Sequence, residues 1–422
     1  MAAYYEYYTY DKKTKVRLSQ ADFFIDVQIK LDTKSPDMKY WARIRPKSSP
    51  PPTPAMKNDI TIRFDPRCDF GCTGAGTNFA WDGSMTWKGA KEYDAHEVTG
   101  QATLTYDVQN DMNGGANGSG WDGKSRKDSI RSREFPVGFI GPEFSGASGD
   151  DDTDLGLNGD NLFQSRSRCD FADVGLPPGC VFQEYAPGYT IKSNEFPAAA
   201  AHIYLIRSKM GLKNNGDANT GPGSNPFHPL HYLPMSSKPE HKDNQRNEWD
   251  RGANQNRNKI CGRSGQYGFQ PHKLTKGAIK QYAHPKRDVA SCDEYSFNAT
   301  YESAGMPASM MPSGATSNEV ANGAVCVQTY EGKAADGKIY LRDDGRYPEP
   351  DWKNVSCGRS SMALSVNSGA MRPFSAFAKA YRMLDADPYY VYAPLADIGC
   401  DDAVQKEIVE CEITDLDPDL IP

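Results

Sequence analysis

The sequence lacks any apolar run that approaches the length of a transmembrane helix, so we expect no membrane-spanning segment. Apolar residues are also somewhat scarce: 38% of the 422 residues are hydrophobic and 24% are charged, as in a soluble globular protein. The first ten residues lack the charged start and apolar middle of a signal peptide. A chain of this length exceeds one ordinary core, and we therefore expect two domains.

Zinc-binding patterns are missing as well, because the ten cysteines include no Cys-x2-Cys pair and the histidines do not cluster near them. The cysteines instead fall into close neighbours along the chain, and their even number favours disulfides, which are typical of an oxidising compartment. We therefore expect a secreted, extracellular protein in its mature form, with its leader removed. Sequence order alone does not fix the pairing, but neighbouring cysteines predict five bridges: Cys68–Cys72, Cys169–Cys180, Cys261–Cys292, Cys326–Cys357 and Cys400–Cys411.

Composition divides the chain into three parts. Residues 1–106 are β-rich, with short apolar and polar alternation at 16–31 and 59–64, and predict a small antiparallel sheet or sandwich. Residues 107–165 are rich in Gly, Asp and Ser and predict a long loop or linker. Residues 166–422 mix helix and strand patterns. The expected fold class is α+β: a β-rich N-terminal domain, then a disulfide-stapled α/β domain with a small sheet and a few helices.

The third part contains recognisable elements. Pro in the first turn and a run of alanines predict a helix over 197–209, with Gly211 as its stop. Apolar residues recurring on one face predict a second helix over 373–384, followed by a strand over 388–392. Residues 324–330 and 338–342 are expected to pair as a hairpin.

Charge is unevenly distributed along the chain. Residues 238–287 contain twelve Lys or Arg against four Asp or Glu, although the whole chain has a net charge of −7. Clustered cations hold a phosphate backbone, so this stretch is expected to contact nucleic acid. A solvated basic loop is the alternative.

The most informative motif is the run from Cys292 to Glu302, in which Asp293, Glu294 and Glu302 lie among aromatic residues. Carboxylates are costly to bury beside apolar neighbours unless something pairs with them. A metal ion is one such partner, and metal-assisted hydrolysis would then follow. Asp293 and Glu294 are adjacent, so on a strand they point to opposite faces, and only one lines a site with Glu302.

This run resembles the Cys-Asp-Glu-Tyr-Pro-Phe-Ala-Ser-Thr-Tyr-Glu-Gly signature of secreted NucA/NucB-type deoxyribonucleases. The resemblance implies a secreted metal-dependent endonuclease that hydrolyses DNA with low sequence specificity, using Mg²⁺ or Mn²⁺. A toxin role would add a protein inhibitor as a partner. The resemblance covers residues 166–392 through an ordered series of short motifs: Arg168-Cys169-Asp170, Ala201-His202-Ile203, Pro229-Leu230-His231, Asn256-Arg257, Asn367 and the aromatic segment 374–391.

The resemblance makes the acids of the run active-site residues, with Asp293 and Glu302 as our first choice for the metal. Glu294 is a third catalytic candidate, with a structural role as its alternative. His202 is the candidate general base, because histidine carries a proton near neutral pH. A half-buried helix histidine is the alternative. Asn367 is expected to orient the water or complete the metal shell.

Three further residues are expected to bind substrate. Arg257 is expected to hold a phosphate oxygen with its two-pronged guanidinium, or else to serve as a structural ion-pair partner. Asn256 either binds substrate or braces a turn. His231 is a secondary candidate for substrate binding, and the alternative is an ordinary loop residue.

The chain departs from the family signature at four positions: Ser296 replaces Pro, Asn298 replaces a small residue, Ser303 replaces Gly, and Val366 replaces the Asp before Asn367. Loss of the Gly restricts the backbone if that turn needs a positive φ. The alternative function is therefore a catalytically weakened or inactive secreted protein that keeps a nuclease-like scaffold for binding or structure.

Overall fold

The computed structural model divides into two compact units, Met1–Gln183 and Glu184–Pro422, which are described here separately. None of the described helices is long and apolar enough to cross a membrane. The structure describes residues 2–11, 13–46, 61–63, 72–73, 87–88, 98–106, 134–137, 143–145, 165–170, 177–182, 185–193, 195–233, 252–265, 268–272, 289–312, 314–336, 338–384, 386–393 and 400–413.

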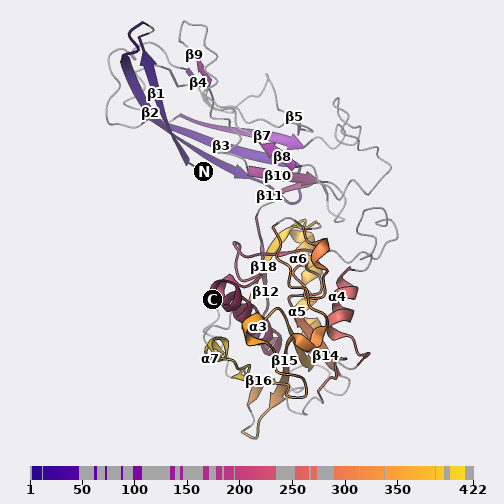
Figure 1. The fold of residues 1–422 in the computed structure, drawn as a ribbon. Helices are drawn as coiled ribbons and strands as arrows, with labels where there is room; N and C mark the ends of the chain where they lie inside the picture. The colour runs from indigo at the N-terminus through magenta and orange to yellow at the C-terminus, as the bar shows by residue number, and fades with distance from the viewer. Residues whose placement is uncertain are drawn as a thin grey trace. The chain divides into compact units, whose positions relative to one another are not determined.

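The first unit is built on an antiparallel sheet with strand order β1-β2-β3-β7-β5 (Figure 1). Apolar side chains of its central strands, such as Val27, Met38 and Tyr40, are buried on one face, and the alternating polar residues lie on the other. The strands are β1 (Ala2–Tyr10), β2 (Arg17–Lys30), β3 (Asp37–Pro46), β5 (Cys72–Thr73) and β7 (Val98–Tyr106).

Two three-stranded sheets complete the first unit, with orders β11-β10-β8 and β6-β4-β9. The sulfur of Cys169 on β10 lies 3.8 Å from that of Met38 on β3, so the β10 sheet covers the buried face of the larger sheet. The strands are β4 (Thr61–Arg63), β6 (Trp87–Lys88), β8 (Glu134–Val137), β9 (Glu143–Ser145), β10 (Ser165–Asp170) and β11 (Gly179–Phe182).

The observed boundary differs from the one expected at residue 166. β10 pairs with β11 on one side and with β8 on the other, and the amide of Cys180 on β11 donates to the carbonyl of Asp32, so both strands belong to the first unit. β8 and β9 also lie within 107–165, where a loop or linker was expected. Composition could not show this, because short strands inserted among Gly- and Ser-rich segments have no periodicity of their own.

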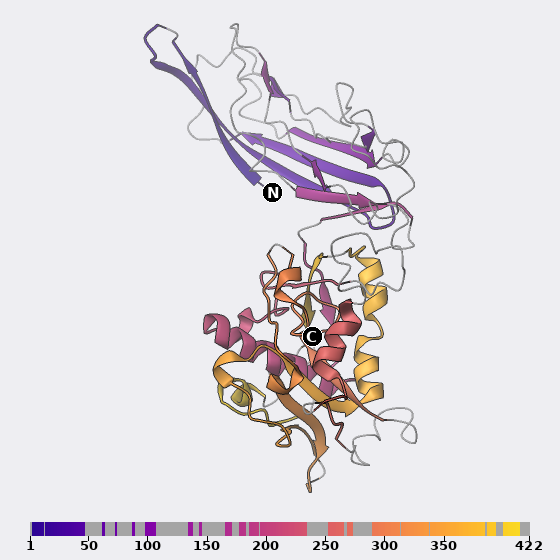
Figure 2. The same cartoon turned by 45° about the vertical axis from the view of Figure 1, so that its right-hand side comes forward.

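The second unit contains a five-stranded sheet of order β14-β17-β15-β16-β19 (Figure 2). β15 and β17 are parallel, and the other pairs are antiparallel. A three-stranded sheet of order β12-β18-β13 lies in the same unit. The strands are β12 (Gly188–Thr190), β13 (Leu230–His231), β14 (Ala290–Tyr295), β15 (Val327–Lys333), β16 (Ile339–Asp343), β17 (Gly358–Ala363), β18 (Pro388–Tyr392) and β19 (Cys411–Glu412).

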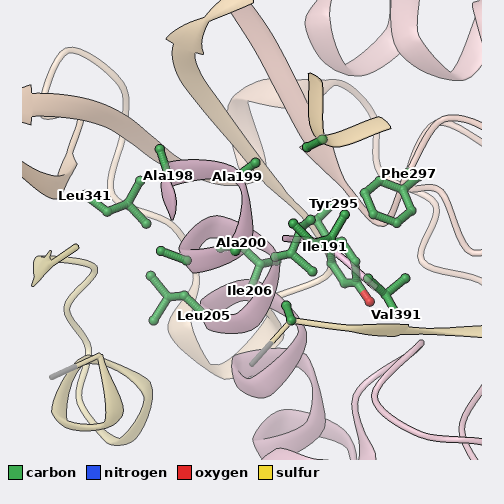
Figure 3. Packing of buried hydrophobic residues seen from close by; sticks show 14 of the residues in the cluster. Ile191, Ala198, Ala199, Ala200, Leu205, Ile206, Tyr295, Phe297, Leu341 and Val391 are labelled. Carbon is green, nitrogen blue, oxygen red and sulfur yellow. The ribbon is translucent and has the colours of Figure 1, made fainter. Parts of the chain in front are cut away.

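Helix α3 is the centre of the second unit's core (Figure 3). Its alanines and Ile206 are buried with Tyr295, Leu341 and Val391, which come from three different strands. The helices are α3 (Pro197–Asn215), α4 (Gly252–Cys261), α5 (Leu364–Met371), α6 (Phe374–Ala380) and α7 (Asp401–Gln405), with short 3₁₀ turns at Ala218–Thr220, Ala308–Met310, Gly323–Val325 and Trp352–Asn354.

Two helix ends differ from expectation. Gly211 does not stop α3: a Cβ there would lie 2.6 Å from backbone atoms of Asp217 and Gly221, so this glycine allows a close approach of the following loop. The helix ends instead at Gly216, whose φ of 69° is left-handed. α6 is shorter than the expected 373–384, because Arg382 adopts a left-handed φ of 52°.

Strand 388–392 and the hairpin of β15 and β16 are confirmed, as is the α+β class. Four of the five expected disulfides are present, Cys169–Cys180, Cys261–Cys292, Cys326–Cys357 and Cys400–Cys411, and the described residues contain no free cysteine. Cys68 of the remaining pair, Cys68–Cys72, lies outside the described residues. Several disulfides are typical of proteins from an oxidising compartment.

Candidate active site

Strand β14 holds the acidic pair, and all its residues from Ser291 to Tyr295 are buried. It pairs with β17 so that Asp293 lies opposite Ser360 and Glu294 opposite Arg359. Because side chains alternate along a strand, the two acids point to opposite faces of the sheet, as the sequence predicted. Each acid therefore has its own surroundings.

Asp293 belongs to a buried polar row on the face covered by α3. Ser360 is its partner on β17, and Thr329 of β15 is in turn paired with Ser360. His202 of α3 joins this row, with Nδ1 3.1 Å from the Thr329 hydroxyl. Its Cε1 atom also lies 2.9 Å from the position that a Cβ on Gly358 would occupy, so the ring packs against the strand itself.

Burial makes both titratable members of this row neutral at pH 7. Loss of hydration, with a smaller contribution from the charge of Glu294, raises the pKa of Asp293 to about 8. Loss of hydration lowers the pKa of His202 to about 3. His202 is fully buried, so its surroundings favour a structural residue over the expected general base, which needs access to substrate or water.

Asn367 of α5 lies on the same side of β14 as Asp293. Its side-chain amide donates to the carbonyl of Cys292 at 2.7 Å and to the hydroxyl of Ser291 at 3.2 Å. These bonds tie α5 to the first half of the strand. The amide therefore positions β14, whereas the sequence suggested that it orients water or a metal ion.

Glu294 lies on the opposite face, where its buried carboxylate forms an ion pair with the partly exposed Arg257 of α4. One guanidinium nitrogen donates to both carboxylate oxygens at 2.9 and 3.1 Å, and the other donates to the carbonyl of Cys292 at 2.7 Å. Burial raises the pKa of Glu294, and the charge of Arg257 opposes that rise. Together with the Cys261–Cys292 bridge, the pair fastens α4 to β14, so Arg257 takes the structural role that was its alternative.

The described residues contain one cluster of potential metal ligands, and it does not include the expected Asp293 and Glu302. Within the described residues, the one group of three His, Cys, Asp or Glu ligand atoms lying within 4.8 Å of one another is Cys261, Cys292 and Glu294. Its sulfurs are bonded to each other, and Mg²⁺ prefers oxygen ligands. Asp293 and Glu302, the two expected metal ligands, belong to no such group.

His231 and Glu302 form the closest pairing of a base and an acid among the expected site residues. Nδ1 of His231 lies 2.6 Å from Glu302 Oε1, and the backbone amide of His231 donates to Oε2 at 2.8 Å. The carboxyl side chain is 2% exposed and the histidine 14% exposed. The pair therefore has a buried carboxylate and a histidine ring that reaches the surface.

Backbone pairing holds this dyad in place. His231 ends β13, which is antiparallel to β18, and its carbonyl accepts from the amide of Tyr301 at 3.0 Å. Asn256 of α4 is fully buried and donates to the carbonyls of Asn298 and Thr300, which lead into Glu302. Asn256 thus braces this turn, as its alternative role stated, and acts on Glu302 through the backbone.

No family model, curated protein or solved structure matches this chain. The resemblance to the secreted nucleases consequently rests on the order of short motifs along the sequence.

The structure shows the surroundings of three of the four positions that depart from the nuclease signature. Ser303 is buried and is not among the described residues with positive φ, so this turn does not need the missing glycine. Val366 is fully buried in the core around α3, where an aspartate would be costly. The Tyr295–Ser296 peptide bond is cis, and the Ser296 side chain is buried.

Sequence reasoning listed His231 and Glu302 separately but did not pair them. They are 71 residues apart: His231 lies on the two-residue strand β13, and Glu302 lies on the loop after β14. No spacing pattern in the sequence connects two such positions. It also missed a second histidine and carboxylate pair, His272 with Asp344 at 3.1 Å, in which Arg346 binds the same carboxylate. The Asp-Asp-Gly-Arg turn at 343–346 does not by itself indicate a functional site.

Proposed function

We propose that the second unit hydrolyses phosphodiester bonds in DNA, with His231 as the proton-transferring group and Glu302 as the carboxylate that orients it. The contact between His231 Nδ1 and Glu302 Oε1 carries this proposal. A carboxylate that accepts from Nδ1 fixes the tautomer in which Nε2 is the proton acceptor. The His231 side chain is 14% exposed, so part of the ring is open to solvent, as a proton-transferring group requires.

The reaction needs one proton acceptor and one proton donor. The oxygen of a water molecule attacks phosphorus while Nε2 of His231 takes its proton, and the bond to the leaving oxygen breaks. The same proton then passes from Nε2 to the leaving oxygen, so the histidine returns to its neutral form. Glu302 stabilises the transient imidazolium at 2.6 Å.

DNA is the proposed substrate because of the ordered motifs and the basic stretch 238–287. Among the described residues of that stretch, Arg257 and Lys259 are bound to Glu294 and Glu319, and Arg263 is exposed. A requirement for Mg²⁺ or Mn²⁺ stays a prediction, as does inhibition by a protein partner. The four disulfides support secretion as the setting of this activity.

A plasmid-nicking assay with purified full chain tests the proposal, run with Mg²⁺, with Mn²⁺ and with a chelator. We expect His231→Ala and Glu302→Gln each to reduce nicking roughly 10²- to 10⁴-fold. His228→Ala is the matched control for a nearby histidine, and thermal unfolding checks that each variant folds. Equal nicking by wild type and both variants would exclude the dyad, and no nicking under any condition would exclude the activity.

A secreted binding or structural protein with an inactive nuclease-like scaffold is the second candidate. The burial of His202, Asp293 and Asn367 favours it, because these side chains hold α3, α5 and β14 together without reaching solvent. Binding of DNA by the wild type and by Glu302→Gln with equal affinity, without strand cleavage in any divalent metal, would support this function.

A further inference from the structure

Strands β2, β3 and β7 of the first unit present one face on the side opposite to their buried side chains. Side chains of the opposite face, such as Val27, Tyr40 and Ala42, are buried, so the alternating residues point outward. We call this set the outward face; its described members are Phe24, Asp26, Gln28, Lys30, Asp37, Lys39, Trp41, Arg43, Arg45, Thr99, Gln101, Thr103 and Thr105.

We propose that the outward face binds single-stranded nucleic acid, with bases stacked on Trp41 and phosphates held by the surrounding cations. This inference goes beyond the proposed hydrolysis, because the face belongs to the first unit and binding there requires no catalytic residue of the second unit.

The first observation is a pair of like charges placed side by side. Lys30 of β2 is directly opposite Lys39 of β3, and both side chains are exposed. Like charges at directly opposed positions destabilise a sheet. Neither lysine has an ion-pair partner within the described part of the chain. A bound anion would remove this repulsion.

The second observation is an aromatic ring between two amide side chains. Gln28 of β2, Trp41 of β3 and Gln101 of β7 form one row across three strands, with both glutamines exposed and Trp41 partly exposed. An aromatic side chain on a sheet is a stacking surface for a base, and flanking amides can donate to and accept from base edges. These residues and the two lysines also line, with Phe182, a hollow of about 560 Å³.

A second group of cations lies on the other side of Trp41. The Arg43 guanidinium is 5.8 Å from the Trp41 ring centroid, and Arg43 and Arg45 both bind the single carboxylate of Asp26. Two guanidinium groups that share one carboxylate keep a positive excess. The other acid of the face, Asp37, accepts a hydrogen bond from Thr105.

The spacing of these rows favours a nucleic acid strand over a compact anion. The row that contains Trp41 lies between the row of Lys30 and Lys39 and the row that contains Arg43. Neighbouring rows are two residues apart on each strand, which is roughly 7 Å. The face therefore alternates cation, aromatic ring and cation along one direction. A polymer that alternates phosphates and stackable bases matches this order, whereas a sulfated polysaccharide would match only the cations.

Binding of a fluorescein-labelled oligothymidine to the full chain, measured by fluorescence anisotropy with a chelator present and with the strand shown to be intact after each titration, tests the proposal. We expect Trp41→Ala to weaken binding about tenfold, since stacking supplies much of the affinity for single strands. Lys30→Gln with Lys39→Gln is expected to reduce the slope of log K against log salt by about 1.4, or about 0.7 for each phosphate contact. Lys13→Gln with Lys15→Gln, in the β1–β2 turn, is the control with the same change in charge.

Hydrogen exchange with and without the oligothymidine locates the binding site, and protection over 24–45 supports the proposal. Wild-type affinity in Trp41→Ala, or equal effects of the two lysine pairs, would overturn it. Competition by heparin together with no effect of Trp41→Ala would identify a general polyanion surface and would also overturn it. Because the variants retain His231 and Glu302, nicking activity that survives loss of oligothymidine binding separates this inference from the proposed hydrolysis.

Discussion

The buried carboxyl group of Asp293 should make the stability of the second unit depend on pH in an unusual direction. Its pKa is raised from 3.8 to about 8, mainly because burial disfavours the charged form. Between these two values the folded protein holds one proton that the unfolded chain has lost. Stability therefore falls as pH rises, by about 1.4 kcal/mol per pH unit.

Asp293→Asn removes this effect while keeping the shape of the protonated side chain. From pH 5 to pH 7, we expect the free energy of unfolding of the wild type to fall by about 3 kcal/mol relative to the variant. Glu294, whose pKa is also raised, is present in both proteins, so the part of its contribution that does not depend on the charge at residue 293 cancels in the difference.

His202 produces the opposite slope over part of the range. Burial lowers its pKa from 6.5 to about 3, so between these values the unfolded chain binds the extra proton and stability rises with pH. In the wild type the two slopes offset each other from about pH 4 to 6.5. Above that range only the Asp293 contribution remains, and the free energy of unfolding falls as pH rises. The variant should show the rise from His202 alone.

Urea unfolding with intact disulfides, followed by tryptophan fluorescence at half-unit steps from pH 4.5 to 8, measures these slopes. The two units can unfold in separate transitions, so the same transition is compared in both proteins. Parallel curves for wild type and Asp293→Asn would refute the reasoning, because Asp293 would then have no raised pKa. If adding Mg²⁺ at pH 7 removes the difference, Asp293 binds the ion as the sequence predicted.

Three other changes test the packing around the site. Gly211→Ala should destabilise the second unit by about 1–3 kcal/mol in urea unfolding, because the added Cβ would lie too close to backbone atoms. Gly216→Ala is its control: the added Cβ has no atom within 4 Å, so the variant carries only the cost of the left-handed φ, about 1 kcal/mol. Arg257→Ala should cost about 1–3 kcal/mol, because the buried carboxylate of Glu294 loses its partner, and adding Glu294→Gln should recover part of it; no recovery would argue against the ion pair. Asn256→Ala should cost about 1–3 kcal/mol and reduce nicking, with a normal melting temperature contradicting its role as a brace.

Local chemistry is where sequence reasoning succeeded. Alternation in β2 and β4, the Pro and Ala residues of α3, and the hairpin of β15 and β16 depend on contacts within a few residues. The opposite orientation of Asp293 and Glu294 follows from the pleat of any strand. Four neighbouring cysteine pairs were also recognised, because short loops bring their sulfurs together readily.

Helix ends and unit boundaries were less predictable. Gly211 is a residue type that commonly ends helices, but here it lets the following loop approach α3 closely. β10 reads as the start of the second domain, but its hydrogen bonds join it to β8 in the first unit. Both outcomes depend on which distant segment packs against the residue, and propensity contains no information about that partner.

The sequence by itself indicated the α+β class, four of the disulfide pairs and the set of residues from which a site could be made. Only the tertiary structure decided which of them meet: His231 with Glu302, Arg257 with Glu294, and His202 in a dry row with Asp293. The physical reason is that an ionisable side chain gains its role from burial and from its charged neighbours, and both are set by long-range strand pairing and helix packing.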